Sequence, residues 1–287
     1  MKLYVEKGHA FKICQMTDIH LGTYPFERTD ERTLAHLRSL LESNEFNLFM
    51  LTGDIITGDN NDDPHKSLKV LFDLLNEFET PVAITYGNHD ANGPYGYDYI
   101  RGFESELQHL ACKNNSYLSG KKENYMLEIL DKATGEIVNK SFVWDSGISS
   151  KWPDISQYPA IDLDQINWYV ETSKSYAAKT FDVGFMHIPL PEYKMVDRNK
   201  ITGKFGSKVG SSEINSGLFH EILKQNNIKA LFSGHDHYNN FSGSYAGIHL
   251  NYGNVTGYNC DGDLPRGVTE IDLYNDGLQR KNILFDV

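Results

Sequence analysis

The sequence predicts an α/β protein built around strands that end in polar clusters. Short apolar runs of strand length alternate with longer segments whose apolar residues recur at helical spacing. Five of the apolar runs end in Gly, Asp, Asn or His. The carboxyl ends of parallel strands are the edge where open α/β sheets bind ligands, so we expect a site there.

Composition and charge narrow the class of protein. The chain has 287 residues, of which 40% are hydrophobic and 23% charged, and no repeat or linker divides it, so we expect a single domain over residues 1–287. A net charge of −12 makes nucleic acid an unfavourable partner. Three cysteines without paired spacing predict a cytoplasmic compartment, and the lack of a transmembrane-length apolar run predicts no membrane partner. Nothing in the sequence indicates the oligomeric state.

The first part of the chain has βαβ order. Asp30 is the expected N-cap of the first helix, and Asp63 followed by Pro64 opens the second. The expected elements in turn are a strand over 11–16, a helix over 30–41, a strand over 48–51, a helix over 64–78, a strand over 82–85 and a helix over 96–110.

The second part mixes hairpins with further α/β units. A Gly-, Lys- and Arg-rich segment over 191–212 is long for a connection and is a candidate lid or binding loop. The other expected elements are a hairpin over 125–144, a helix over 162–178, a strand over 181–186, a helix over 214–225, a strand over 228–233 and tail strands over 247–251, 267–273 and 283–285.

The polar residues at the five strand ends have the chemistry of metal ligands. Carboxylates, an amide oxygen and imidazoles bind divalent ions such as Mn, Fe or Zn, and no cysteine lies in these clusters. Seven ligands suit two ions if one carboxylate is shared, and Asp54, alone at a central strand end, fits that role. Two ions about 3.5–4 Å apart suit in-line displacement at phosphorus. The polar residues at the strand ends, from which seven ligands would come, are the eight residues Asp18, His20, Asp54, Asn88, His89, His187, His235 and His237.

Five sequence blocks in order resemble the calcineurin-like metallophosphoesterase superfamily. They are Asp18-x-His20, Gly53-Asp54, Gly87-Asn88-His89-Asp90, His187 and Gly234-His235-x-His237, within residues 11–254. The segments 187–191, 234–239 and 252–258, with Arg266-Gly267 after them, are similar to a purple-acid-phosphatase-like subgroup. The resemblance implies a four-layer α/β sandwich of two mixed sheets flanked by helices, with a dinuclear site at loops between them.

The same resemblance implies a role for each block residue. One metal would be held by Asp18, His20, Asp54 and His237, and the second by Asp54, Asn88, His187 and His235. A metal-bridging hydroxide would attack the phosphate ester in line, with Mn the expected ion and Fe or Zn the alternatives. His89 would face the substrate and assist the leaving group, with Asn88 and Arg266 as further substrate contacts.

The sequence departs from the purple-acid-phosphatase pattern at one position, and two functions other than a phosphomonoesterase stay open. Purple acid phosphatases place an iron-binding tyrosine shortly after the Gly-Asp pair, whereas here Ile55, Ile56 and Thr57 follow it, which puts an obligatory ferric ion in doubt. A phosphomonoesterase is the preferred function, acting on a small molecule or a phosphoprotein. A phosphodiesterase or nuclease on the same site is the first alternative, and a non-catalytic protein-binding scaffold the second.

Overall fold

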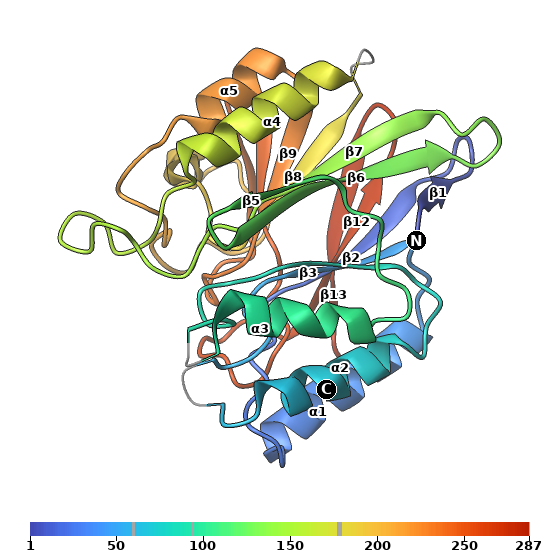
Figure 1. Ribbon diagram of the computed structural model, residues 1–287, viewed down its shortest axis with the longest axis vertical. Helices are drawn as coiled ribbons and strands as arrows, with labels where there is room; N and C mark the ends of the chain where they lie inside the picture. Colours follow the sequence, from blue (N-terminus) through green and yellow to red (C-terminus); the bar gives the residue numbers. More distant parts are fainter. Residues whose placement is uncertain (59–60, 93–94, 177–179, 287) are drawn as a thin grey trace.

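The computed structural model of the protein describes residues 1–58, 61–92, 95–176 and 180–286. Within these residues, two mixed β-sheets pack face to face and helices cover the outer face of each (Figure 1). The arrangement confirms the predicted four-layer α/β sandwich.

One sheet has five strands among the described residues, and three helices lie against its outer face. In spatial order the strands are β13 (Leu278–Leu284), β12 (Gly267–Leu273), β2 (Phe11–Met16), β3 (Leu48–Thr52) and β4 (Val82–Thr85). The helices are α1 (Arg28–Glu42), α2 (Pro64–Leu75) and α3 (Gly96–Gly102). Because β2, β3 and β4 are parallel, their carboxyl ends share one edge.

The other sheet has eight strands in the described part of the chain, with two helices and a short 3₁₀ helix on its outer side. Its strands are β1 (Leu3–Val5), β5 (Asn114–Ser119), β6 (Lys122–Asp131), β7 (Ile137–Val143), β8 (Asp182–Phe185), β9 (Ile228–Ser233), β11 (Ile248–Tyr252) and β10 (Ser242–Tyr245). The covering elements are α4 (Leu163–Ser175), α5 (Leu218–Gln225) and η2 (Pro191–Met195). β8 and β9 are parallel, so their carboxyl ends also lie together.

The inner faces of the two sheets form a shared apolar layer. Ile13 and Met50 from the five-stranded sheet belong to one buried cluster with Val183 and Phe232 from the eight-stranded sheet. The Phe185 and Phe232 rings stack with their centroids 5.3 Å apart. This layer fixes the two sheets against each other, so the loops at their carboxyl ends are held in register. Among the described residues, no helix is long and apolar enough to cross a lipid bilayer.

The helix expected over 96–110 is shorter than predicted. α3 ends at Gly102 and is followed by a 3₁₀ turn, η1 (Phe103–Glu106). Beyond the turn, the His109 carbonyl accepts from the Val82 N–H at 2.9 Å, and the Ala111 N–H donates to the Val82 carbonyl at 2.8 Å. Pairing with β4 therefore ends the helical run, because those backbone groups cannot serve both structures.

Other boundaries differ in smaller ways. α5 begins at Leu218 instead of 214, because Gly217 before it has a left-handed φ of 93°. α4 ends at Ser175, and 177–178 of its predicted range lie outside the described residues. The predicted N-cap Asp63 accepts from the Lys66 N–H, but Asp30 lies inside α1, where it pairs reciprocally with the true N-cap, Glu27. The prediction missed β1, β5 and β10, and β13 extends from 278 to 284 rather than from 283 to 285.

Candidate metal centre

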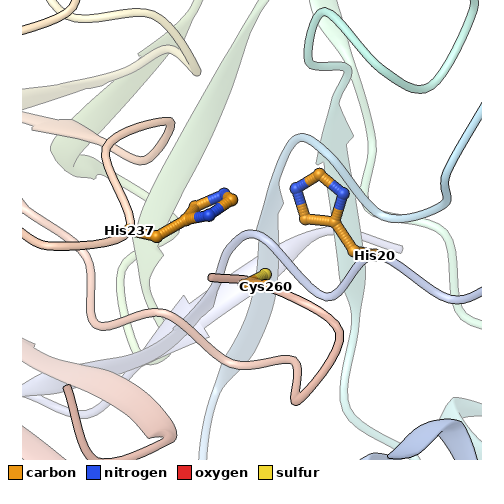
Figure 2. A group of neighbouring side chains, drawn as sticks. All are labelled: His20, His237 and Cys260. Carbon is orange, nitrogen blue, oxygen red and sulfur yellow. The ribbon is translucent and has the colours of Figure 1, made fainter. Parts of the chain in front are cut away.

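The polar loops after β2, β3, β8 and β9 converge at one end of the two sheets. Their side chains, with Cys260 from the segment between β11 and β12, form three groups in which potential ligand atoms lie within 4.8 Å of one another. The groups are Asp18, His20 and Asp54; Asp54, His187 and His235; and His20, His237 and Cys260, the last shown in Figure 2. The structure therefore brings together six of the predicted metal ligands, together with a cysteine that sequence reasoning missed.

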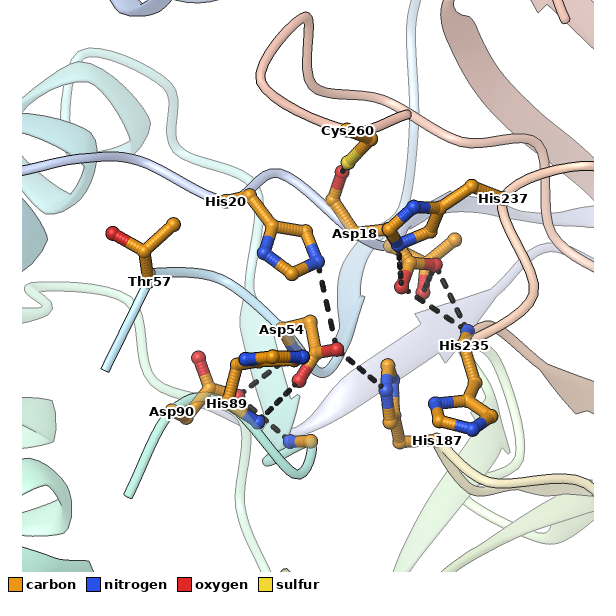
Figure 3. Close-up of polar contacts among 12 residues, drawn as sticks. Asp18, His20, Asp54, Thr57, His89, Asp90, His187, His235, His237 and Cys260 are labelled. Carbon is orange, nitrogen blue, oxygen red and sulfur yellow. Dashed lines mark hydrogen bonds and ion pairs between the residues drawn. The ribbon is translucent and has the colours of Figure 1, made fainter. Parts of the chain in front are cut away.

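Asp54 lies at the centre of the cluster. Its Oδ2 is 3.0 Å from Nε2 of His187 and 3.5 Å from Nε2 of His20 (Figure 3). Its Oδ1 accepts a hydrogen bond from the His89 backbone N–H at 2.8 Å. Asp54 is thus the carboxylate shared between two of the three ligand groups, the position from which one carboxylate can bridge two ions.

Asp18 occupies the second acidic position. Its Oδ1 is 3.5 Å from Nε2 of His237, and both of its carboxylate oxygens accept from the His235 backbone N–H at 3.1 Å. Cys260 approaches from a different loop, and its Sγ donates to the Asp18 carbonyl at 3.0 Å. The carboxylate is therefore fixed by the backbone of the histidine loop that it faces.

The backbone at the site is strained. Asp18, His20, Asp54 and His235 have φ values of 53°, 49°, 50° and 80°, a left-handed region that residues with a side chain rarely adopt. Such strain persists only where the surroundings enforce it, and it gathers at functional sites. Here the loops enforce one another, because the His20 N–H donates to the Asp54 carbonyl at 2.9 Å.

Two glycines allow the loops to approach this closely. A Cβ on Gly53 would lie 2.6 Å from Nδ1 of His187, and φ at this residue is 89°. A Cβ on Gly234 would lie 1.9 Å from Oγ1 of Thr17 and 2.6 Å from Oδ2 of Asp18. The glycines that precede Asp54 and His235 in the sequence are thus required by the contact between the carboxylate and histidine loops.

Four atoms of the predicted ligands are buried without a hydrogen bond among the described residues, although Nε2 of His20 and Nε2 of His187 lie near Oδ2 of Asp54. They are Nε2 of His20, Oδ1 of Asn88, Nε2 of His187 and Nε2 of His235. A buried polar atom left unpaired costs about 1–3 kcal/mol, so four in one place need an explanation. At His187, Nδ1 lies 2.8 Å from the Thr52 carbonyl, to which it donates, so Nε2 is the ring nitrogen that faces Asp54. These atoms suit divalent metal ions as their missing partners.

The protonation of His187, His235 and His237 differs. Burial opposes the charged form of His187, but the Asp54 carboxylate outweighs it and raises the pKa to about 9. Burial likewise opposes charge on His237, but the hydrogen bond to Asp18 raises its pKa to about 12. Burial and the nearby His187 lower the pKa of His235 to about 3. His235 is therefore already neutral before a metal binds, whereas His187 and His237 must lose a proton before they can bind a metal.

The two carboxylates remain ionised. Although burial opposes it, the hydrogen bond to His237 lowers the pKa of Asp18 to about 2. The His187 imidazolium lowers the pKa of Asp54 well below its ordinary value against a larger opposing effect of burial. Both side chains can therefore bind cations across the neutral pH range.

Asp90 supports the site from behind. Its buried side chain accepts from the backbone N–H groups of Asp54 at 2.9 Å, Ile55 at 2.6 Å, Ile56 at 3.1 Å and Gly87 at 2.7 Å. One carboxylate thus holds together the loop after β3, which carries Asp54, and the loop after β4, which carries His89. Asp90 follows His89 in the sequence, but only the folded loops reveal this role.

His89 lies at the rim. Its ring centroid is 5.1 Å from that of His20, and it belongs to none of the three ligand groups (Figure 3). The residue is partly exposed, unlike the buried His187. Tyr158, which the prediction missed, contacts His235 edge-on, with the two ring centroids 4.5 Å apart.

Arg266 does not have the role expected for it. Its Nε donates to the Gly257 carbonyl at 2.8 Å, one terminal nitrogen to the Leu264 carbonyl at 2.7 Å, and the other to the Cys260 carbonyl at 2.6 Å. The guanidinium is buried and committed to backbone carbonyls, so it folds the 257–266 loop instead of clamping a substrate phosphate.

The expected lid over 191–212 is held against the protein. Tyr193 is fully buried, and Thr202 pairs with Ser242 through two backbone hydrogen bonds of 2.9 Å. At its far end, the Gly210 N–H donates to Oδ2 of Asp236, between the two site histidines, at 2.9 Å. Of the predicted basic residues, Lys204 pairs with Asp263 at 2.7 Å. The segment therefore supports the histidine loop from outside.

Comparison with known proteins agrees with this geometry. Residues 11–239 match the calcineurin-like phosphoesterase family. The chain is 28% identical over 294 residues to "Probable inactive purple acid phosphatase 29" of Arabidopsis thaliana, covering 91% of this chain and 75% of that protein.

Two solved structures share the fold. A dimetal phosphatase from Danio rerio has a TM-score of 0.65 at 12% identity, with 96% of each chain covered. A purple acid phosphatase from yellow lupin (Lupinus luteus) has a TM-score of 0.52 at 12% identity, covering 96% of this chain and 52% of that one. The chain belongs to the calcineurin-like phosphoesterase family and is a hydrolase acting on phosphoric ester bonds.

Proposed function

We propose that residues 1–287 form a single-domain, dinuclear metal-dependent phosphomonoesterase. The observation that carries the proposal is the convergence of His20, His187 and His235 on the Asp18 and Asp54 carboxylates, with the Nε2 atom of each imidazole buried. A first ion would be held by Asp18, His20, Asp54 and His237, and a second by Asp54, Asn88, His187 and His235. Mn is the expected ion, with Fe or Zn as alternatives.

Bound ions of this kind supply a water-derived nucleophile at neutral pH and positive charge for the phosphoryl oxygens. The side chains of the protein would position the ions and the substrate. Asp54 holds the two positions in fixed relation, because Asp90 and the neighbouring loop immobilise its backbone. His89, partly exposed beside His20, is placed to donate a proton to the leaving oxygen or a hydrogen bond to the phosphoryl group. Asn88 precedes His89 in the same loop, and its Oδ1 is buried without a hydrogen bond among the described residues.

The substrate would be a phosphate monoester carried by a small molecule or a phosphoprotein. The names of the dimetal phosphatase and the purple acid phosphatase among the structural neighbours favour a phosphatase. The net charge of −12 disfavours a nuclease, since nucleic-acid binding depends on neutralising phosphates with basic residues.

The relative from Arabidopsis is named as an inactive enzyme, which gives the scaffold alternative a specific basis. Loss of catalysis in a protein of this kind is expected to leave gaps in the ligand set. Here all seven ligand positions carry ligating side chains, and four residues keep strained backbone conformations. Strain of about 1–3 kcal/mol per residue has no purpose in a scaffold.

The test is a comparison of initial rates on a chromogenic phosphate monoester and the matching diester, with the protein loaded with Mn. We expect monoester hydrolysis to dominate. Preference for the diester would replace the monoesterase by a phosphodiesterase on the same site. No turnover of either ester by protein that binds no metal would favour the scaffold.

A further inference from the structure

The loop 257–266 brings a thiol to the metal centre. Arg266 gathers the carbonyls of Gly257, Cys260 and Leu264 around its guanidinium and so curls the loop toward the loop that carries Asp18 and His20. Asp261 in the same loop contacts Nδ1 of His237 at its carboxylate, which leaves Nε2 of that ring facing Asp18. The loop therefore orients one metal-site histidine and presents Cys260 beside it.

The position of Cys260 is that of a ligand. Its Sγ and one ring nitrogen each of His20 and His237 lie within 4.8 Å of one another, and Figure 2 shows the three side chains together. Cys260 is 8% exposed and His20 is 6% exposed. Nε2 of His20 is one of the buried atoms without a hydrogen bond, so the thiol lies beside an imidazole that still has an unsatisfied nitrogen.

We propose that Cys260 is a further ligand to the ion held by Asp18, His20 and His237. The inference rests on the proposed function only in requiring that this ion binds. On coordination the thiol loses its proton to solvent, and a thiolate–metal bond replaces the hydrogen bond from Sγ to the Asp18 carbonyl.

The two metal positions would therefore prefer different metal ions. Thiolate is a soft ligand that favours Zn, Fe or Co over Mn, whereas carboxylate and carbonyl oxygens suit Mn. The position with Asn88, His187 and His235 has no sulfur ligand among the described residues. The protein would thus hold a softer ion beside His237 and accept Mn at the other position.

Cobalt tests the inference, because a cobalt–thiolate bond gives a charge-transfer absorption band in the near ultraviolet that nitrogen and oxygen ligands do not. We expect the band in wild-type protein titrated with Co(II), its loss in Cys260→Ser and Cys260→Ala, and its retention in Cys112→Ala, which removes an exposed cysteine outside the three ligand groups. Persistence of the band in both Cys260 variants would overturn the assignment.

A second measurement needs no variant. X-ray absorption on zinc-loaded wild-type protein should show a sulfur neighbour at about 2.3 Å in addition to nitrogen and oxygen. Two bound ions with only nitrogen and oxygen ligands, and with monoester hydrolysis intact, would refute the role of Cys260 and leave the proposed function standing. Failure to bind any ion would refute both.

Discussion

Metal binding at the His187 position should strengthen steeply with pH. The ion must displace a proton from His187, whose pKa the Asp54 carboxylate raises to about 9. At pH 7 only about 1% of such an imidazole is neutral, which weakens apparent binding on the order of a hundredfold, or roughly 2.7 kcal/mol. His235 adds no such penalty, because burial lowers its pKa to about 3. Affinity should therefore rise about tenfold per pH unit between pH 6 and 8 and level off near pH 9.

The assay is competition for Mn with a chromophoric chelator whose own pH dependence is known, at pH 6, 7 and 8. His187→Asn keeps an oxygen ligand that cannot be protonated, so its pH dependence should be flatter by about one proton per ion. His220→Ala, which alters an exposed histidine on α5, is the matched control and should behave as wild type. Wild-type affinity that does not change between pH 6 and 8 would refute the assignment of a proton to His187.

Three further substitutions separate the roles of residues around the centre. His89→Ala should lower turnover on a monoester by about 10²-fold or more while two ions per chain remain bound; loss of the metal would show that His89 is a ligand. Asp90→Asn turns an amide N–H₂ toward two backbone N–H donors and should lower the free energy of unfolding by about 2–4 kcal/mol, measured in urea on metal-free protein. The exposed Asp73→Asn serves as its control, and a loss below about 1 kcal/mol would contradict the account. Burial raises the pKa of Asp145 to about 7, so the folded state keeps a proton that the unfolded state releases above pH 4. Binding of this proton stabilises the folded state, and the stabilisation is lost as the pH rises from 4 through 7. Asp145→Asn should therefore gain about 2–3 kcal/mol relative to wild type between pH 5 and pH 8 in paired urea titrations, and a constant difference would rule this out.

The sequence predicted the cluster because the fold places strand ends by simple rules. Parallel strands bring their carboxyl ends to one edge, so Asp18, Asp54 and Asn88 had to lie together once β2, β3 and β4 were recognised. His187 and His235 follow β8 and β9 in the same way. Local patterns could not show that the two sheets face each other across the site, which the family resemblance implied and the structure confirmed.

The sequence did not predict the positions of residues that long-range contacts bring to the site. Cys260 and Asp261 lie in a loop with no periodicity, and their approach to His237 depends on Arg266 collecting carbonyls along that loop. Arg266 itself was misassigned, since an arginine near a phosphate site suggests anion binding until its donors are seen to be used. The prediction of a helix over 96–110 was wrong for a related reason, because backbone pairing of 109–111 with Val82 outweighed local helical propensity.

The central claim is that one shared carboxylate holds two ions that are needed for ester hydrolysis. The most direct test measures metal content and monoester hydrolysis together in wild type, Asp54→Ala and the control Asp73→Ala. We predict two ions and turnover in wild type and in the control, and loss of both in Asp54→Ala, because Asp54 lies within 3.5 Å of His20 and His187. Full turnover by Asp54→Ala would contradict the dinuclear mechanism.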